Sequence, residues 1–158
     1  MPLESEPLRY TGHLLRRLQQ LHLALWTKHV SSDISSVQFA ALAVLERRPG
    51  ASQREVGEEL DIDRSTVADL VRRMADHGLI ERALSDSDRR RNVLRLTAPG
   101  RAELERLRPL VVALEPLLTG ALDDGERTDL RAMMQRMLEH GIHEGHLAGP
   151  DRRAAADG

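Results

Sequence analysis

Residues 52–97 read SQREVGEELDIDRSTVADLVRRMADHGLIERALSDSDRRRNVLRLT, and this stretch decides the fold. It opens with Ser52 and Glu55, a capping box in which each side chain bonds a backbone N–H of the other residue, so a helix is predicted to begin at Ser52. Asp63 is the next good N-cap, and Gly78 suits the left-handed end of the helix that follows. Two short helices joined by two or three residues have helix-turn-helix spacing.

The second of these helices has a predicted buried side and an exposed polar start. Four apolar residues at helical spacing are expected to point inward: Val67, Leu70, Val71 and Met74. The opening turn, Arg64, Ser65 and Thr66, is polar and can donate hydrogen bonds. In a recognition helix this turn meets base edges, where Arg can fork onto guanine and Ser or Thr can reach a purine or a phosphate. Arg72 and Arg73, two turns later, suit the flanking phosphates.

A change of period after the second helix predicts a β-hairpin. Apolar residues at 79–84 and 93–96 flank the segment SDSDRRRN, whose serines and aspartates are turn formers. Three consecutive arginines at the tip can lie along phosphates or enter a minor groove: Arg89, Arg90 and Arg91. Asp88 beside them can hold an arginine in position for a phosphate. The hairpin is therefore interpreted as a wing.

The segments DRSTVADLVRRMADHGLIER and DSDRRRNVLRLTAPGRAEL together resemble the MarR family of bacterial transcriptional regulators, and the resemblance covers roughly residues 8–140. The fold it implies is mainly α with a small two-stranded β-wing, a winged helix-turn-helix with N- and C-terminal dimerisation helices. It implies that Asp88 and Arg90 position the wing and contact DNA. The base-reading turn of the family matches three residues here: Arg64, Ser65 and Thr66.

Apolar residues at helical spacing run through both ends of the chain. A long helix is predicted from about residue 8 to residue 30. Further helix starts are signalled by Ser35 with Gln38, by Thr97, and by Asp123 or Asp124. Pro109 and Pro116 are expected to kink or break the helix that Thr97 begins.

The predicted organisation is a single domain with two tails. Its parts are a disordered N-terminal tail at 1–7, dimerisation helices at 8–34 and 98–140, a DNA-binding lobe at 35–97 and a flexible C-terminal tail at 141–158. The end helices carry more apolar surface than one winged domain can cover, so two protomers are expected to intertwine. A two-fold dimer presents recognition helices about 34 Å apart and predicts an inverted-repeat operator. The alternative is that these helices complete a monomeric core.

Composition limits the possible functions. The chain of 158 residues has 41% hydrophobic content, which is enough for one core, and its net charge of −2 makes charge placement decisive for DNA binding. Zero cysteine excludes disulfides, thiolate metal sites and a thiol sensor. The sequence has no apolar run of about 18 residues and no basic-then-apolar N-terminus, so a cytoplasmic protein without membrane contact is expected. No catalytic triad or phosphate loop is evident, so neither an enzyme nor a cofactor is predicted.

The first long helix carries a candidate effector site. His22, Trp26 and His29 share a face with Leu15, Leu18 and Gln19, and Arg16 lies about 100° round from Leu15. An imidazole, an indole and a guanidinium suit an aromatic acid. The segment RYTGHLLRRLQQLHLALW resembles MarR-type repressors of aromatic-acid catabolism, most closely one that responds to protocatechuate. That resemblance implies ligand binding by Arg16 and His22. Gln19 and Trp26, which share the face of His22, complete the predicted ligand site. The alternative is a core tryptophan with a satisfied or solvated histidine.

The sequence therefore predicts a dimeric, sequence-specific DNA-binding repressor released by a small aromatic acid. One alternative is a metal-responsive regulator, because three histidines at a spacing of three could gather zinc or nickel with a nearby glutamate: His140, His143 and His146 with Glu139 or Glu144. Gly141 and Gly145 weaken a rigid ligand face there, and no metal site is predicted. A second alternative is a winged helix used only for protein contacts.

Overall fold

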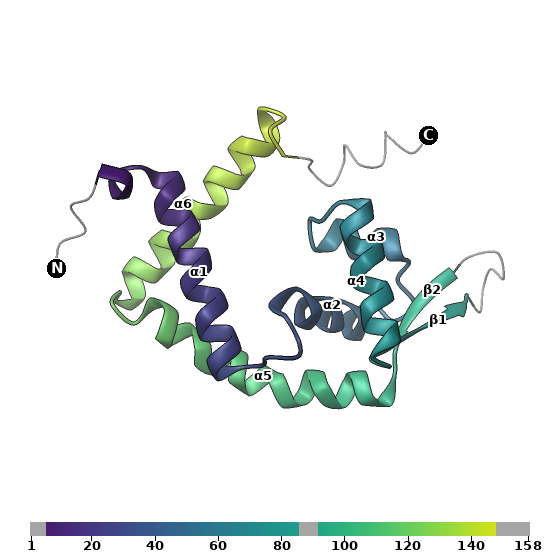
Figure 1. Ribbon diagram of the computed structural model, residues 1–158. Helices are drawn as coiled ribbons and strands as arrows, with labels where there is room; N and C mark the ends of the chain where they lie inside the picture. The colour runs from purple at the N-terminus through teal and green to yellow at the C-terminus, as the bar shows by residue number, and fades with distance from the viewer. Residues whose placement is uncertain (1–5, 86–91, 148–158) are drawn as a thin grey trace.

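The structure is a computed structural model of the chain that describes residues 6–85 and 92–147. Its elements follow in this order: the 3-10 helix η1 Glu6–Arg9, α1 Thr11–His29, α2 Ser36–Arg47, α3 Gln53–Glu59, α4 Arg64–Asp76, β1 Ile80–Leu84, β2 Asn92–Leu96, α5 Ala98–Thr119 and α6 Asp124–His143. In Figure 1 the lobe formed by α2, α3, α4 and the two strands lies on one side, α1 and α6 lie on the other, and α5 runs between them. The predicted mainly α fold with a two-stranded wing is confirmed.

The helix starts predicted from capping residues are confirmed, because capping depends only on residues close in sequence. Both capping boxes form, Ser35 with Gln38 and Ser52 with Glu55. Asp63 accepts hydrogen bonds from the first turn of α4, Thr97 accepts one from Gly100, and Asp123 forms a further capping box with Glu126. Gly78 follows α4 with φ +70°, the left-handed conformation expected at a helix end.

The core joins the lobe to α1 and α5. Its most deeply buried side chains come from α2, α3, α4 and α5, and include Leu42, Leu45, Met74, Leu104 and Leu107. Trp26, near the end of α1, packs into the same cluster. The beginning of α5 is therefore part of the lobe's core as well as of the helical end of the molecule.

Both edges of β2 form hydrogen bonds, one to β1 and the other to the segment before α3. Strands β1 and β2 pair antiparallel with Ile80 opposite Leu96. On the other edge, the Leu94 N–H donates to the Ala51 carbonyl at 2.8 Å, and the Gly50 N–H donates to the Leu94 carbonyl at 3.2 Å. Because residues 50 and 51 lead directly into α3, the wing strands and the helix-turn-helix are held together.

Helix α5 continues through both of its prolines, so of the expected kink or break at Pro109 and Pro116 the break does not occur. Its ribbon bends along its course in Figure 1. A proline removes its own donor and clashes with one preceding carbonyl, but the other hydrogen bonds of a long helix can keep the chain helical past it.

Described elements extend into both of the predicted tails. Residues 6–9 form η1, where a disordered segment to residue 7 is expected. Helix α6 runs through Gly141 to His143, and the Gly141 carbonyl accepts the N–H groups of His146 and Leu147 in a C-terminal turn. Regular structure therefore extends past Gly141, the predicted start of a flexible tail; residues 148–158 lie outside the described part.

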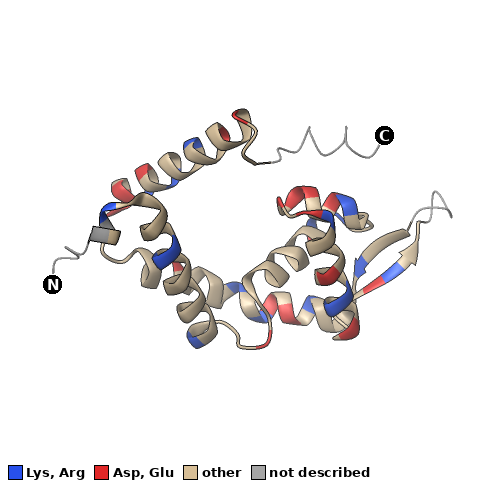
Figure 2. Cartoon of the chain, turned by 45° about the horizontal axis from the view of Figure 1, so that its top comes forward, with Lys and Arg blue, Asp and Glu red and all other residues tan. Residues whose placement is uncertain are grey.

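Helix α6 leaves its apolar side uncovered in the single chain, and no residue of this helix is buried. We call this side the apolar face of α6; its largest exposed members are Met133, Met134, Met137 and Leu138. Figure 2 shows α6 standing away from the lobe. Among the described residues, no helix combines the length and the apolar character needed to cross a membrane.

Candidate nucleic-acid interface and effector site

The first turn of α4 is polar, exposed and held by its N-cap. Arg64, Ser65 and Thr66 are all exposed, and Val67 immediately after them is buried. The carboxylate of Asp63 accepts the Ser65 N–H at 2.9 Å and the Thr66 N–H at 3.0 Å. Both neighbouring hydroxyl groups also donate to it, Ser65 at 2.6 Å and Thr66 at 2.5 Å. The predicted reading turn is therefore a rigid group of polar side chains on the surface.

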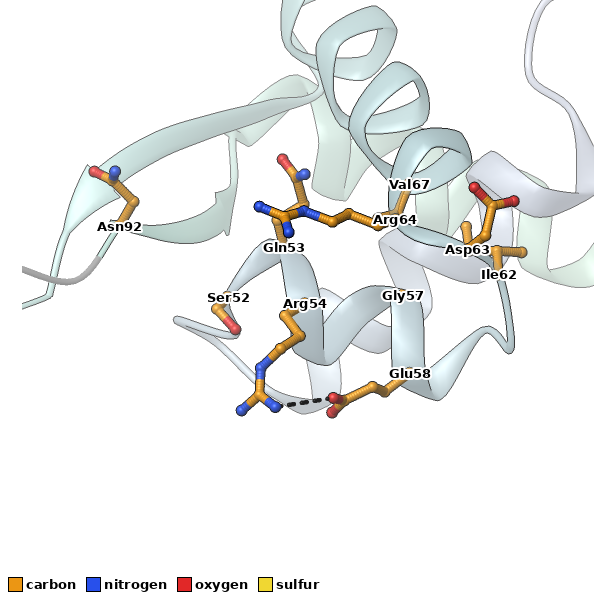
Figure 3. Close-up of a pocket in the computed structure, with 10 residues that line it drawn as sticks. All are labelled: Ser52, Gln53, Arg54, Gly57, Glu58, Ile62, Asp63, Arg64, Val67 and Asn92. Carbon is orange, nitrogen blue, oxygen red and sulfur yellow. Dashed lines mark ion pairs between the residues drawn. The ribbon is translucent and has the colours of Figure 1, made fainter. Parts of the chain in front are cut away.

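A hollow of about 680 Å³ opens beside this turn. It lies between α3, the start of α4 and the first residue of β2, and its lining includes Gln53, Gly57, Asp63, Arg64 and Asn92. Figure 3 shows the Arg64 side chain extending across the hollow from α4, with Asn92 on the wing strand at its far side. The recognition turn and the end of β2 nearest the wing tip thus face one concave surface.

The sequence did not single out Gln53 or Asn92 as part of this surface. The Gln53 amide oxygen accepts a bond from the Arg82 guanidinium of β1 at 3.4 Å, which joins α3 to the wing. These residues meet only in the tertiary fold, and no local spacing signals their proximity. Asn92 directly follows the arginine run, which is the one signal that could have included it.

The predicted phosphate contacts on α4 are exposed. Arg72 and Arg73 both lie on the surface. The Arg72 guanidinium donates to the Asp69 carboxylate at 2.9 Å, and this bond and the charge of Asp69 raise the pKa of Arg72 above its ordinary value. Arg72 would therefore meet a phosphate from a position that a carboxylate supports. The four predicted wing-tip residues lie outside the described part of the chain: Asp88, Arg89, Arg90 and Arg91.

Several arginines near the hollow are engaged in ion pairs. Arg54 pairs with Glu58 along α3 at 3.2 Å, and Arg48 reaches both Glu55 at 3.4 Å and Glu59 at 3.1 Å. Figure 2 shows acidic and basic residues intermingled on the lobe. The pairs offset one another's charge, so these arginines add little net positive charge to the surface beside the hollow.

At the other end of the molecule, His22 and Trp26 lie together on α1. Their ring centroids are 6.0 Å apart, and the centroid of the Trp26 ring lies 5.9 Å from that of Phe39 in α2. The indole N–H donates to the Ile34 carbonyl at 2.7 Å, and only 5% of Trp26 is exposed. Trp26 is thus a core residue that supports the half-buried His22.

Arg16 and Gln19 are exposed on the same helix, further toward its start. Arg16 precedes His22 by six residues, which separates them by about 9 Å along the axis and about 120° around it. The structure therefore brings His22 and Trp26 together, whereas Arg16 lies on an adjoining side of α1. A ligand that touched both Arg16 and His22 would have to lie across the surface of the helix.

The histidines near the C-terminus do not form a metal cluster. His140 and His143 line a shallow surface of α6 with Arg136 and Met137, and His146 follows after the helix has ended. In the described ranges 6–85 and 92–147, no three His, Asp or Glu side chains lie close enough to hold an ion together.

Comparison with known proteins agrees with this geometry. A model described as the MarR family matches residues 32–91, the segment that contains the helix-turn-helix and most of the hairpin. The transcriptional repressor NicR of Pseudomonas putida KT2440 is 29% identical over 142 residues, covering 87% of this chain and 90% of NicR. The solved structure of the regulator PcaV from Streptomyces coelicolor, in complex with its natural ligand, has 35% identity and a TM-score of 0.80, covering 85% of this chain and 96% of PcaV.

The chain belongs to the MarR family. A further solved structure, that of Bordetella bronchiseptica BpsR, concerns regulation of its DNA binding by 6-hydroxynicotinic acid; it is 29% identical with a TM-score of 0.75, and the match covers 81% of this chain and 92% of BpsR. This MarR-family protein is a transcriptional regulator and not an enzyme, and the hollow beside α4 is its candidate nucleic-acid interface.

Proposed function

We propose that this regulator is a cytoplasmic, dimeric repressor that binds an inverted-repeat operator and is released from it by a small aromatic acid. The observation that carries the proposal is the exposed turn of Arg64, Ser65 and Thr66, which shares a concave surface with the wing strand. A turn of this kind can enter a major groove while the arginines of the wing follow the backbone or the minor groove.

The dimer in this proposal buries the apolar face of α6. Exposed methionines and a leucine along one side of a long helix are costly in water, and a second copy of the same helix can cover them. A two-fold axis through this end of the molecule leaves the lobes outermost. Two copies of α4 can then reach successive major grooves about 34 Å apart, which requires an inverted-repeat operator.

The effector in this proposal is a phenolic carboxylate such as protocatechuate. PcaV is described with a natural ligand, and DNA binding by BpsR is regulated by 6-hydroxynicotinic acid, which is itself an aromatic acid. In this chain Arg16 and Gln19 would hold the acid group, and His22 would contact the ring from its position against Trp26. A guanidinium and an amide suit a carboxylate, because both donate hydrogen bonds to it.

A path of direct contacts leads from this site toward the lobe. His22 touches Trp26, and Trp26 touches Phe39 of α2 and bonds the Ile34 carbonyl just before that helix. A ligand that moves His22 therefore presses on the junction of α1 and α2. The ligand must bind more tightly to a conformation that does not fit the operator. A difference of about 1–3 kcal/mol in its binding free energy is enough to relieve repression substantially.

The test is a titration of the regulator on its promoter DNA with protocatechuate, followed by fluorescence anisotropy. Arg16→Ala and His22→Ala should bind the operator like wild type but lose most of the release. Arg17→Ala is the matched control, since its guanidinium bonds Gln20 at 3.1 Å on the same exposed helix and it should respond normally. Normal release of both site variants would show that the effector site is elsewhere.

A further inference from the structure

We infer that Ser65 and Thr66 read the major groove as hydrogen-bond acceptors, that Asp63 sets this polarity, and that the turn therefore selects adenine and cytosine, the bases that present an amino group in the major groove. This inference rests on the proposed DNA binding and specifies which base edges the turn selects. Asp63 acts here as a positioning residue, because it works through its neighbours.

The hydroxyl protons of Ser65 and Thr66 both point to Asp63. A serine or threonine hydroxyl has one proton to donate and lone pairs to accept with. The Ser65 hydroxyl donates to Oδ1 of Asp63 at 2.6 Å, and the Thr66 hydroxyl donates to Oδ2 at 2.5 Å. Both protons are committed to the same carboxylate, so each hydroxyl offers only its lone pairs to another molecule.

The protonation state of Asp63 decides which groups supply the protons of these bonds. The hydroxyl of Ser65, then that of Thr66, and then the Thr66 backbone N–H lower the pKa of the Asp63 carboxyl well below its ordinary value. Asp63 is therefore ionised at neutral pH and accepts hydrogen bonds without donating any. The protons of these bonds must belong to the two hydroxyls, so the polarity of the turn is fixed.

The turn lies on the surface and is anchored in the core. Asp63, Ser65 and Thr66 are all exposed, while the next residue, Val67, is 2% exposed and anchors the turn in the core. The backbone N–H groups of Ser65 and Thr66 are held by the same carboxylate, so the reading atoms are fixed before DNA arrives. Such preorganisation reduces the entropy lost on binding.

Acceptor-only hydroxyls discriminate between bases. In the major groove the donors are the N6 amino group of adenine and the N4 amino group of cytosine, whereas guanine N7 and O6 and thymine O4 are acceptors. Ser65 and Thr66 can therefore bond adenine or cytosine and cannot donate to guanine, thymine or a phosphate while Asp63 holds them. Arg64 lies between Asp63 and Ser65 in the sequence. Its guanidinium group carries only donors, which suits guanine.

The experiment begins with selection from random double-stranded DNA by the full-length protein and by Ser65→Ala and Thr66→Val. Each variant should relax the preference at one position, and wild type should prefer adenine or cytosine there. The amino group is then deleted at that position, using purine for adenine or 2-pyrimidinone for cytosine. Wild-type affinity should fall about three- to tenfold, whereas the matching variant should lose nothing further.

Asp63→Asn separates polarity from capping, because asparagine is an equally good N-cap but places an amide donor against one of the hydroxyls. That hydroxyl can then donate outward, and the preference at its position should shift toward guanine or thymine. Circular dichroism and the unfolding midpoint verify that α4 is intact in this variant. Asp76→Asn, at the far end of α4, changes the same charge and should keep the wild-type preference.

The inference is overturned if wild type selects guanine or thymine at the positions that Ser65→Ala and Thr66→Val relax, or if these variants relax nothing. It is also overturned if folded Asp63→Asn retains the wild-type preference. Failure of the wild-type protein to retain any duplex has a different meaning, since it removes the proposed DNA-binding function itself.

Discussion

At the scale of single residues, Trp26 connects the candidate effector site with the core. Helical spacing placed Trp26 beside His22 but left open whether it meets a ligand or packs inside. The indole bond to the Ile34 carbonyl and the contact with Phe39 place its ring in the core. Ile34 lies in the connection after α1 and Phe39 lies in α2, and periodicity within one helix cannot reveal contacts with residues outside it.

Trp26→Phe should keep most of the packing and lose the bond to Ile34. Ile34 is 7% exposed, so its carbonyl would lose a partner in a buried place, at a cost of about 1–3 kcal/mol in the free energy of unfolding. Trp26→Ala, the comparison variant, should cost about 3–5 kcal/mol because it also opens a cavity. Urea denaturation measures both, and wild-type stability of Trp26→Phe would contradict a structural role for the N–H.

Gly100→Ala should destabilise the protein for a steric reason. A Cβ at this position would overlap the Leu79 carbonyl, which also accepts the Thr97 N–H, so the backbone itself must shift. We expect a loss of about 2–3 kcal/mol in the free energy of unfolding. Gly12→Ala, where a Cβ meets nothing within 4 Å, is the matched control and should be neutral or slightly stabilising. Equal stability of the two variants would refute the close approach.

At the scale of elements, one hydroxyl joins the recognition helix to α5. The Thr97 hydroxyl accepts the Gly100 N–H at 3.1 Å as the cap of α5 and donates to the Gly78 carbonyl at 2.6 Å just after α4. The end of one helix and the start of another are therefore linked through a single side chain across the base of the wing. This junction joins the lobe to the helix that leads toward the dimer end.

Thr97→Val should remove both bonds while keeping the shape of the side chain. The expected loss is about 1–2 kcal/mol, the usual effect of removing a threonine cap. Thr128→Val is the control, because its hydroxyl donates only to the Asp124 carbonyl within α6 and its loss should be nearly neutral. Chemical denaturation compares the two; a Thr97→Val variant as stable as Thr128→Val would show that the junction does not depend on this hydroxyl.

The elements also show what sequence reasoning can predict. Caps and the helix-turn-helix were predictable, because Ser35, Ser52 and Asp63 act on residues two or three positions away. Continuity of α5 through Pro109 was not, since it depends on how much hydrogen bonding surrounds the proline. In the candidate site, the reading turn was predicted from its cap, whereas Gln53 and Asn92 reach the hollow only through tertiary packing.

At the scale of the whole molecule, the apolar face of α6 should control assembly. Leu138, 54% exposed in the single chain, should be buried between two protomers, and Leu138→Glu would place a charge there. Light scattering at low micromolar concentration should report about twice the 17.7 kDa chain mass for wild type and a shift toward the single mass for Leu138→Glu. Operator affinity should fall in parallel.

Ala132→Glu introduces the same charge on the opposite side of α6, where it is exposed. This variant should remain dimeric and bind DNA like wild type. If both variants were dimeric, the interface would have to exclude the apolar face of α6, and the predicted spacing of the two recognition helices would lose its basis.

The attachment of β2 on both edges makes each lobe a rigid unit, in which the distance between the recognition helix and the wing strands is fixed. Leu94 lies opposite Arg82 of β1 and is also bonded to the segment before α3, so the hairpin strands cannot shift without the helix-turn-helix. Inserting one base pair inside a half-site should therefore abolish binding. The same insertion at the centre of the inverted repeat should only weaken binding, since the distance between the two lobes of the dimer depends on long helices that can tilt.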